Sequence, residues 1–343
     1  MLSATKCVTL AHKKNEEMNY KILFEKILSN DIQFANRSQI GKRENGPKAF
    51  SCAPQKRKEK LWHIFSENGE IPEAFDVAFK NVTHGPGYER KRITQLNSSS
   101  LLALLCFWNV SKEHPITINN IEFTEVYFEV ENTVFDHNSS VDILLVSEKE
   151  STWLYLESKF TEPLSPTNRL WLSYKYYDIY KNIRENLKIN VFTPQKREHK
   201  EKEEFEITQN KKRYYGGIKQ MVSHLIGVLK GASDKANAEY KEVYNNGLPK
   251  SIILGTILYD FSKYDVDDFK NLYSDYVSFY EDSFSLQNGK LIISTINDCL
   301  GGTNVYKKSS ISVMPQVLTY QDVFGKQNPN FLMSNVAQFY SIY

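Results

Sequence analysis

The stretch that decides the fold is VDILLVSEKESTWLYLESKF, residues 141–160. It contains two apolar runs, Val141–Val146 and Thr152–Phe160, whose branched and aromatic residues are typical of β-strands. The polar residues Glu148–Ser151 between them predict a hairpin turn. Upstream, Ile116–Val130 alternates loosely between apolar and polar positions, as a half-buried strand does, and Asp136–Asn138 then forms a turn. Three adjacent strands in a meander are therefore predicted.

Three charged residues interrupt these apolar runs. Asp142 lies one residue into the first run, and Glu157 and Lys159 lie at the end of the second. A hairpin would bring Asp142 and Glu157 to one edge of the sheet, and Glu157 and Lys159 would share a face because they are two residues apart. Two neighbouring carboxylates repel each other unless a cation joins them, and Mg²⁺ prefers oxygen ligands. A lysine beside them can orient the attacking water and offset transition-state charge. The pattern predicts a phosphodiesterase site; a surface hairpin with ordinary charges is the alternative.

The spacing Glu-x-Lys is a weak signal by itself. It recurs at Glu89, Glu198 and Glu239, each time in polar surroundings. Only the copy at Glu157 lies in an apolar run and follows a strand that carries an aspartate.

Further elements are predicted outward from this hairpin. A helix is expected over about 98–109, with Ser98–Ser100 as capping candidates. Apolar spacing predicts another over Gly216–Lys230, closed by Gly231. Ser251–Tyr259 is apolar enough for a central buried strand. The segment 165–214 reads as a solvated helix face or an insertion, and the tail from Asp260 as aromatic-rich helices with strands at Lys290–Thr295 and Ile311–Leu318.

The motif VDILL…WLYLESK resembles the PD-(D/E)xK nuclease superfamily, and GYER…SSSLLALL with ESKFTEPL resembles bacterial proteins described as restriction endonucleases. The resemblance implies an α/β, restriction-endonuclease-like core of order α-β-β-β-α-β, with a central mixed sheet flanked by helices. It covers residues 85–260, including the insertion 165–214. Residues 1–84 would then be a peripheral N-terminal region with a basic arm, and 261–343 a C-terminal extension packing on the core.

The resemblance also implies roles for individual residues. Asp142 and Glu157 would bind Mg²⁺, with Mn²⁺ as a substitute, helped by the Ser158 carbonyl, and Lys159 would be the catalytic lysine. Glu89 would reach the metal through water, although a surface charge is an equal reading of its Tyr-Glu-Arg-Lys-Arg patch. Gln220 matches a glutamine that some members carry on the following helix. His224 lies one turn later on the same face and is more simply read as a boundary residue.

The overall charge does not reveal a partner, because 43 basic and 41 acidic residues leave only +2. Basic residues cluster locally at 41–60, 89–92 and 211–213, and the wider stretch 196–213 is charge-dense. These stretches are candidates for phosphate contacts, with a solvated loop as the alternative for 41–60.

Together these features predict a Mg²⁺-dependent endonuclease of restriction or defence type that leaves a 5′-phosphate, with double-stranded DNA as partner and a homodimer as a plausible assembly. Two alternatives remain open: an inactive nuclease-fold subunit for DNA binding or assembly, and a nuclease acting on RNA or on DNA ends. Walker, G-x-S-x-G, H-E-x-x-H and zinc-finger motifs are missing from the sequence.

The cysteines and the apolar runs bear on location. The four cysteines are far apart, which disfavours a zinc site or a disulfide framework, and Cys106 is expected to be buried. The apolar run Leu101–Trp108 is much shorter than the roughly 18 residues that span a membrane. A cytoplasmic protein without a membrane segment is expected.

Overall fold

The computed structural model describes the greater part of the chain, and the described residues are 54–66, 69–84, 93, 95, 98–164, 169–198, 201–209, 216–262, 267–302, 304–305 and 308–343. The chain divides into two compact units, the first formed by 1–109 with 320–343 and the second by 110–319. Each unit is described by itself. Glu89, residues 41–53 of the basic arm and the basic residues 211–213 lie outside the described residues.

The described part of the first unit is helical. Its elements are η1 (Pro54–Lys56), α3 (Arg57–Phe65), α4 (Glu73–His84), α6 (Ser99–Phe107), the π-helical η4 (Gln321–Gln327) and α12 (Ser334–Tyr340). Helix α6 confirms the predicted helix, and the Ser98 side chain caps it by accepting a hydrogen bond from the Leu101 N–H. Cys106 is buried, as expected. The loop prediction for residues up to Lys60 is wrong over 54–60, because buried Leu61 and Trp62 draw the preceding basic residues into the first turns of a helix.

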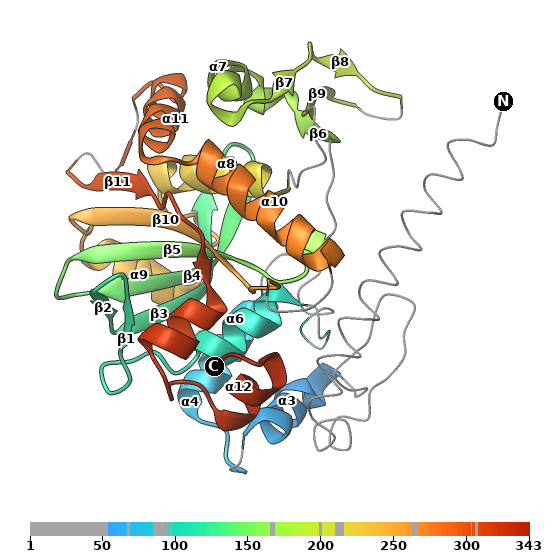
Figure 1. The fold of residues 1–343 in the computed structure, drawn as a ribbon. Helices are drawn as coiled ribbons and strands as arrows, with labels where there is room; N and C mark the ends of the chain where they lie inside the picture. Colours follow the sequence, from blue (N-terminus) through green and yellow to red (C-terminus); the bar gives the residue numbers. More distant parts are fainter. Residues whose placement is uncertain are drawn as a thin grey trace. The chain divides into compact units, whose positions relative to one another are not determined.

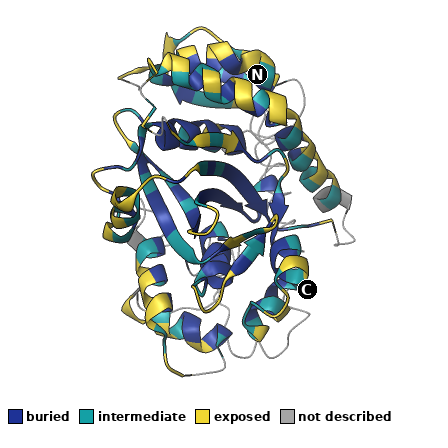
Figure 2. Cartoon of the chain, turned by 90° about the vertical axis from the view of Figure 1, so that its left-hand side faces the viewer, coloured by how far each residue is buried: buried dark blue, intermediate teal, exposed yellow. Residues whose placement is uncertain are grey.

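The second unit is built on a mixed six-stranded sheet flanked by helices (Figure 1). Its strands are β3 (Glu125–Thr133), β4 (Asn138–Ser147), β5 (Thr152–Lys159), β10 (Ser251–Leu258), β11 (Ser310–Val313) and β12 (Leu318–Thr319). Strands β3, β4 and β5 pair antiparallel, which confirms the meander. Strand β10 pairs parallel with β5, β11 and β12, so β5 and β10 occupy the centre. Their buried runs are dark blue in Figure 2.

The predicted single strand Ile116–Val130 is instead three strands. β1 (Ile116–Ile118) and β2 (Ile121–Phe123) form a small hairpin before β3. Asn119 and Asn120, with φ of 50° and 65°, turn the chain between them. Asparagine tolerates this left-handed conformation better than most residues, which explains why the chain reverses there.

Helix α8 (Gly216–Lys230) confirms the predicted amphipathic helix, and its apolar side chains are buried against β3, β4 and β10. It ends at Gly231, which has φ of +92° and donates its N–H to the Gly227 carbonyl. Helix α9 (Ala238–Asn246) follows, capped by the Asn237 side chain, and packs near β3.

The insertion 165–214 folds into a second sheet with a helix. It contains β6 (Arg169–Ser173), η3 (Tyr174–Tyr176), α7 (Tyr177–Leu187), β7 (Asn190–Val191), β8 (Gln195–Lys196) and β9 (Glu203–Thr208). The expectation of a solvated helix face is wrong for the charge-dense stretch, which is β8 and β9. In β9, Phe205 and Ile207 are buried while the alternating glutamates are not, and Phe205 packs on Tyr180 of α7.

Two helices and two short strands complete the second unit. α10 (Asp267–Ser283) and α11 (Leu286–Cys299) confirm the helical tail, and β11 and β12 account for the strand expected near Ile311–Leu318. The strand predicted at Lys290–Thr295 is wrong, because these residues are helical; buried Ile292 and Ile296 lie four residues apart, on one helical face. Among the described helices, none is both long and apolar enough to cross a membrane.

Candidate functional site

The ladder between β4 and β5 stops at the point where the acidic residues begin. Ile143 of β4 pairs with Leu156 of β5, and the next step would bring Asp142 opposite Glu157. At this step the Asp142 side chain takes the place of a backbone partner, because its Oδ2 accepts a hydrogen bond of 2.7 Å from the Ser158 N–H. The hairpin therefore holds Asp142 beside the Glu157–Lys159 segment, as the sequence predicts.

Glu157 is deeply buried and receives three side-chain contacts. Its Oε1 lies 2.6 Å from Lys159 Nζ and 2.5 Å from Gln220 Nε2, and its Oε2 lies 2.8 Å from His224 Nε2. Glu157 and Lys159 are each only 3% exposed, so both members of this ion pair are buried. On the other side of β5, Glu157 pairs with Thr256 of the central strand β10. The carboxylate thus lies in the middle of the sheet, where its position is well defined.

Helix α8 supplies the two polar side chains above the carboxylate. Gln220 and His224 are four residues apart and point to the same side of the helix. His224 is 3% exposed, and its second ring nitrogen, Nδ1, lies 2.8 Å from Oγ of Ser139 on β4. The structure therefore brings both Gln220 and His224 to Glu157. His224, read from sequence as a boundary residue, contacts the acid directly.

The two carboxylates experience opposite electrostatic environments. Burial disfavours the charged form of Glu157, but Lys159 and His224 outweigh it and lower the pKa of this carboxyl to about 2. Burial raises the pKa of Asp142 well above its usual value, and the negative charges of Glu157 and Glu129 raise it further. Asp142 is therefore the group whose negative charge lacks sufficient compensation, and a cation beside it would relieve that repulsion.

Glu129 of β3 is a third carboxylate that the sequence did not single out. The β3–β4 register pairs Phe128 with Ile143 and Val130 with Val141, so Glu129 lies opposite Asp142. Glu129 is 8% exposed, has a φ of 49°, and accepts a hydrogen bond of 2.7 Å from Ser140 Oγ. A positive φ is uncommon for glutamate and marks a locally strained strand. The strand EVYFEVENT contains three glutamates, and only the register identifies the one facing Asp142.

Ser158 contributes through its backbone. Its N–H is directed to Asp142, whereas the carbonyl of the next residue, Lys159, accepts from Tyr259 on the β10 side. Because successive residues of a strand direct their backbone groups to opposite neighbours, the Ser158 carbonyl faces the Asp142 side. This orientation is compatible with the predicted ligand role, which stays a prediction.

The donor set suits a hard divalent cation. Asp142, Glu157 and the Ser158 carbonyl offer oxygen atoms, and Mg²⁺ typically uses one or two carboxylates together with water and substrate phosphate. Within the described part of the chain, no group of three or more His, Cys, Asp or Glu side chains is arranged to hold a metal ion.

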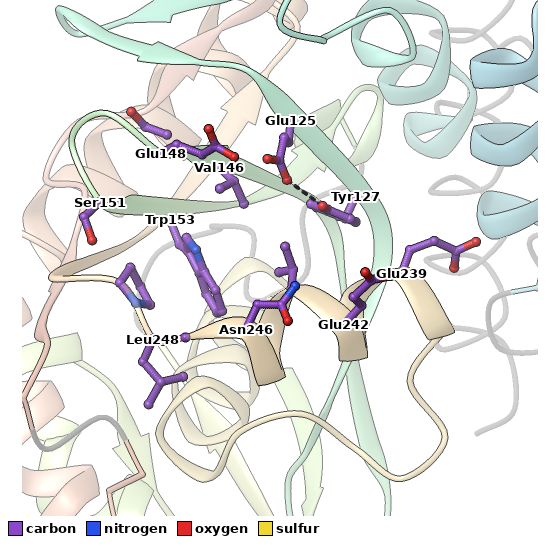
Figure 3. Close-up of a pocket in the computed structure, with 14 residues that line it drawn as sticks. Glu125, Tyr127, Val146, Glu148, Ser151, Trp153, Glu239, Glu242, Asn246 and Leu248 are labelled. Atoms are coloured by element: carbon purple, nitrogen blue, oxygen red, sulfur yellow. Dashed lines mark hydrogen bonds between the residues drawn. The ribbon is translucent and has the colours of Figure 1, made fainter.

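A cavity of about 610 Å³ lies at the opposite end of β4 and β5, around their connecting turn (Figure 3). Glu125, Glu148, Glu239 and Glu242 line it together with Tyr127, whose hydroxyl donates a hydrogen bond of 2.6 Å to Glu125. Four glutamates would repel a phosphate-bearing ligand. The cavity is thus separate from the Asp142–Glu157 constellation and unsuited to the same substrate.

Comparison of the chain with protein-family models, with curated proteins and with solved structures finds no match.

Proposed function

We propose that the chain is a metal-dependent nuclease that hydrolyses DNA phosphodiester bonds, built on a restriction-endonuclease-like core. The order of its elements along the chain supports this fold: α6, the meander β3–β4–β5, α8 and β10 occur in the order of the α-β-β-β-α-β core that the sequence resembles, with β1, β2, the insertion and α9 between them. Strand β10 also lies parallel to β5 beside the meander, which gives the expected mixed sheet.

One observation carries the proposal. Asp142, Glu157 and Lys159, which the motif relates by sequence alone, meet at one point of the sheet, with Gln220 from α8 on the same carboxylate oxygen as Lys159. Burying an acid and a lysine is costly, and a stable fold gains little from such a pair compared with apolar residues. A buried constellation with oppositely shifted carboxylates is typical of a functional site.

Each residue then has a defined task. Asp142 and Glu157 would hold the cation, and the Ser158 carbonyl lies on the side where it could assist. Bound Mg²⁺ would supply Lewis acidity and make a coordinated water more acidic. Lys159 Nζ, fixed against Glu157 Oε1, orients the attacking water and offsets the negative charge that develops on the phosphoryl oxygens. Water attacks phosphorus, the bond to the 3′-oxygen breaks, and the products are a 5′-phosphate and a 3′-hydroxyl. His224 positions Glu157 through Oε2.

The proposal is tested by incubating the protein with plasmid DNA, linear duplex DNA and RNA in Mg²⁺ or in EDTA. We expect cleavage of DNA in Mg²⁺ only. Cleavage that persists in EDTA would contradict the site. Binding without cleavage of any of these substrates would instead favour an inactive DNA-binding or assembly subunit, and cleavage restricted to RNA or to DNA ends would redefine the substrate.

A further inference from the structure

Helix α8 presents two adjacent faces, and only the first belongs to the proposed site. On that face, Gln220 contacts Glu157, His224 contacts Ser139, and Gly227 packs so closely on β3 that an added Cβ would lie 2.9 Å from the Asn132 Cβ. These positions follow one another by one helical turn, so they form a single stripe directed at the sheet.

The second face carries Lys219, Ser223 and Lys230. Their spacings of four and seven residues place them in one stripe, because a helix has 3.6 residues per turn. Ser223 interacts with the hydroxyl group of Tyr176 in the insertion. Lys219 acts electrostatically on His137 in the β3–β4 turn, and Lys230 Nζ lies 5.5 Å from the ring centroid of Phe135 in the same turn. This stripe therefore faces both the turn and the insertion.

The insertion adds two more lysines to the same place. Lys175 Nζ lies 5.8 Å from the Phe135 ring centroid and 2.9 Å from His137 Nδ1, and Lys202 Nζ lies 3.5 Å from Asp136 Oδ2. The Tyr176 hydroxyl, 2.9 Å from His137 Nε2, fixes the insertion to the turn. We call the four lysines around the β3–β4 turn the turn patch: Lys175, Lys202, Lys219 and Lys230.

The turn patch is positively charged even after its internal pairing. Among the described residues, the carboxylate that contacts the turn patch is Asp136. Lys175, Lys202 and His137 all contact this one acid. Lys202 is 79% exposed in its side chain and Lys219 is also exposed, so ammonium groups are presented to solvent. Lys175 and Lys230 both make cation–π contacts with the aromatic ring of Phe135. These contacts hold two like charges close to each other.

We propose that the turn patch binds the phosphate backbone of the nucleic acid whose scissile bond lies at Asp142 and Glu157. This inference rests on the proposed function and identifies the surface that holds the substrate. Lys219 adjoins Gln220, so the basic stripe begins at the site itself. From Lys219 to Lys230 the helix rises about 16 Å at ~1.5 Å per residue. That length equals the axial rise of roughly five base pairs of a B-form duplex, at ~3.4 Å each.

The test measures binding without cleavage. Fluorescence anisotropy of labelled single-stranded and duplex DNA is recorded with the full chain in EDTA over a series of salt concentrations. The double variant Lys175→Gln with Lys230→Gln is compared with Lys149→Gln with Lys250→Gln, which removes two exposed lysines at the opposite end of the sheet. Loss of two phosphate contacts should weaken duplex binding about tenfold and reduce the salt slope by about 1.8, whereas the control should match wild type.

The outcomes separate this inference from the proposed function. Wild-type affinity and salt slope in the turn-patch variant would overturn the patch and leave the cleavage site untouched. Patch-dependent binding by a chain that cleaves nothing would uphold the patch and contradict the nuclease. A third outcome would overturn the patch as a nucleic-acid surface. In it, the wild type has no affinity for DNA, and the turn-patch variant loses binding to anionic lipid vesicles or to an acidic protein. Should the double variant melt early, the exposed Lys202→Gln replaces it, with an expected slope reduction of about 0.9.

Discussion

His224 Nε2 lies 2.8 Å from Oε2 of Glu157, while its Nδ1 lies 2.8 Å from Oγ of Ser139. The ring therefore links β4 to the carboxylate on β5 and fixes one of its two oxygens. The other oxygen, Oε1, is shared by Lys159 and Gln220. Both oxygens of Glu157 are therefore held in place, Oε2 by the ring and Oε1 by Lys159 and Gln220.

Replacing His224 tests this positioning role. His224→Ala leaves Oε2 of a buried carboxylate without its donor, which should lower the free energy of unfolding by about 1–3 kcal/mol and slow cleavage. In His224→Gln the side-chain amide can donate from nearly the position of Nε2, so we expect partial recovery of the cleavage rate. Urea denaturation and single-turnover kinetics measure the two effects. Equal loss of rate in both variants would show that the donated hydrogen bond is unimportant.

Asp142→Asn should stabilise the metal-free protein at neutral pH. Burial raises the pKa of Asp142, so the folded protein binds more protons than the unfolded chain between the ordinary carboxyl pKa and the raised one. The free energy of unfolding of wild type therefore falls as pH rises through that interval, and asparagine abolishes this dependence. In EDTA at pH 7, the melting temperature of the variant should be higher than that of wild type, and this difference should disappear at acidic pH.

Adding Mg²⁺ supplies the control for that prediction. The cation should raise the melting temperature of wild type and have little effect on Asp142→Asn, because binding to the folded state alone stabilises it. A variant that is less stable than wild type in EDTA at pH 7 would contradict the electrostatic account of Asp142.

Gly227 tests how closely α8 must approach the sheet. A Cβ at this position would lie 2.9 Å from Asn132 Cβ, whereas a Cβ at Gly289 in α11 would meet its nearest atom at 3.6 Å. Gly227→Ala should destabilise the fold by about 1–3 kcal/mol through overpacking and displace Gln220 and His224. Gly289→Ala should be neutral or stabilising by up to about 1 kcal/mol, as alanine favours a helix. Comparable effects in both variants would contradict the close packing at Gly227.

The hairpin with its acids was predictable because both signals are local. Alternation and turn residues indicate β4 and β5, and a fifteen-residue separation across one turn places Asp142 near Glu157 whatever the rest of the chain does. Helical spacing likewise places Gln220 and His224 on one face of α8. That this face would meet Glu157 came only from the resemblance, because helix-to-sheet packing depends on contacts distant in sequence.

Other features depend on contacts between residues distant in sequence and could not be predicted from the sequence. Glu129 is identified only by the β3–β4 register and an unusual φ, neither of which the sequence shows. The charged residues of β9 outweighed its alternating Phe205 and Ile207 in the sequence pattern, so no strand was predicted there. The burial of these two residues requires α7. At Lys290–Thr295, β-branched isoleucines suggested a strand, but tertiary packing of Ile292 and Ile296 determines a helix.

The most direct test of the central claim is the single-turnover rate of DNA cleavage in Mg²⁺ for Lys159→Gln beside Lys149→Gln. Glutamine removes the ammonium at Glu157 Oε1 but keeps a side-chain donor, and Lys149 lies in the exposed β4–β5 turn. The account predicts a fall of about 10²–10³-fold for Lys159→Gln and a wild-type rate for Lys149→Gln. A Lys159→Gln protein that cleaves DNA at the wild-type rate would contradict it.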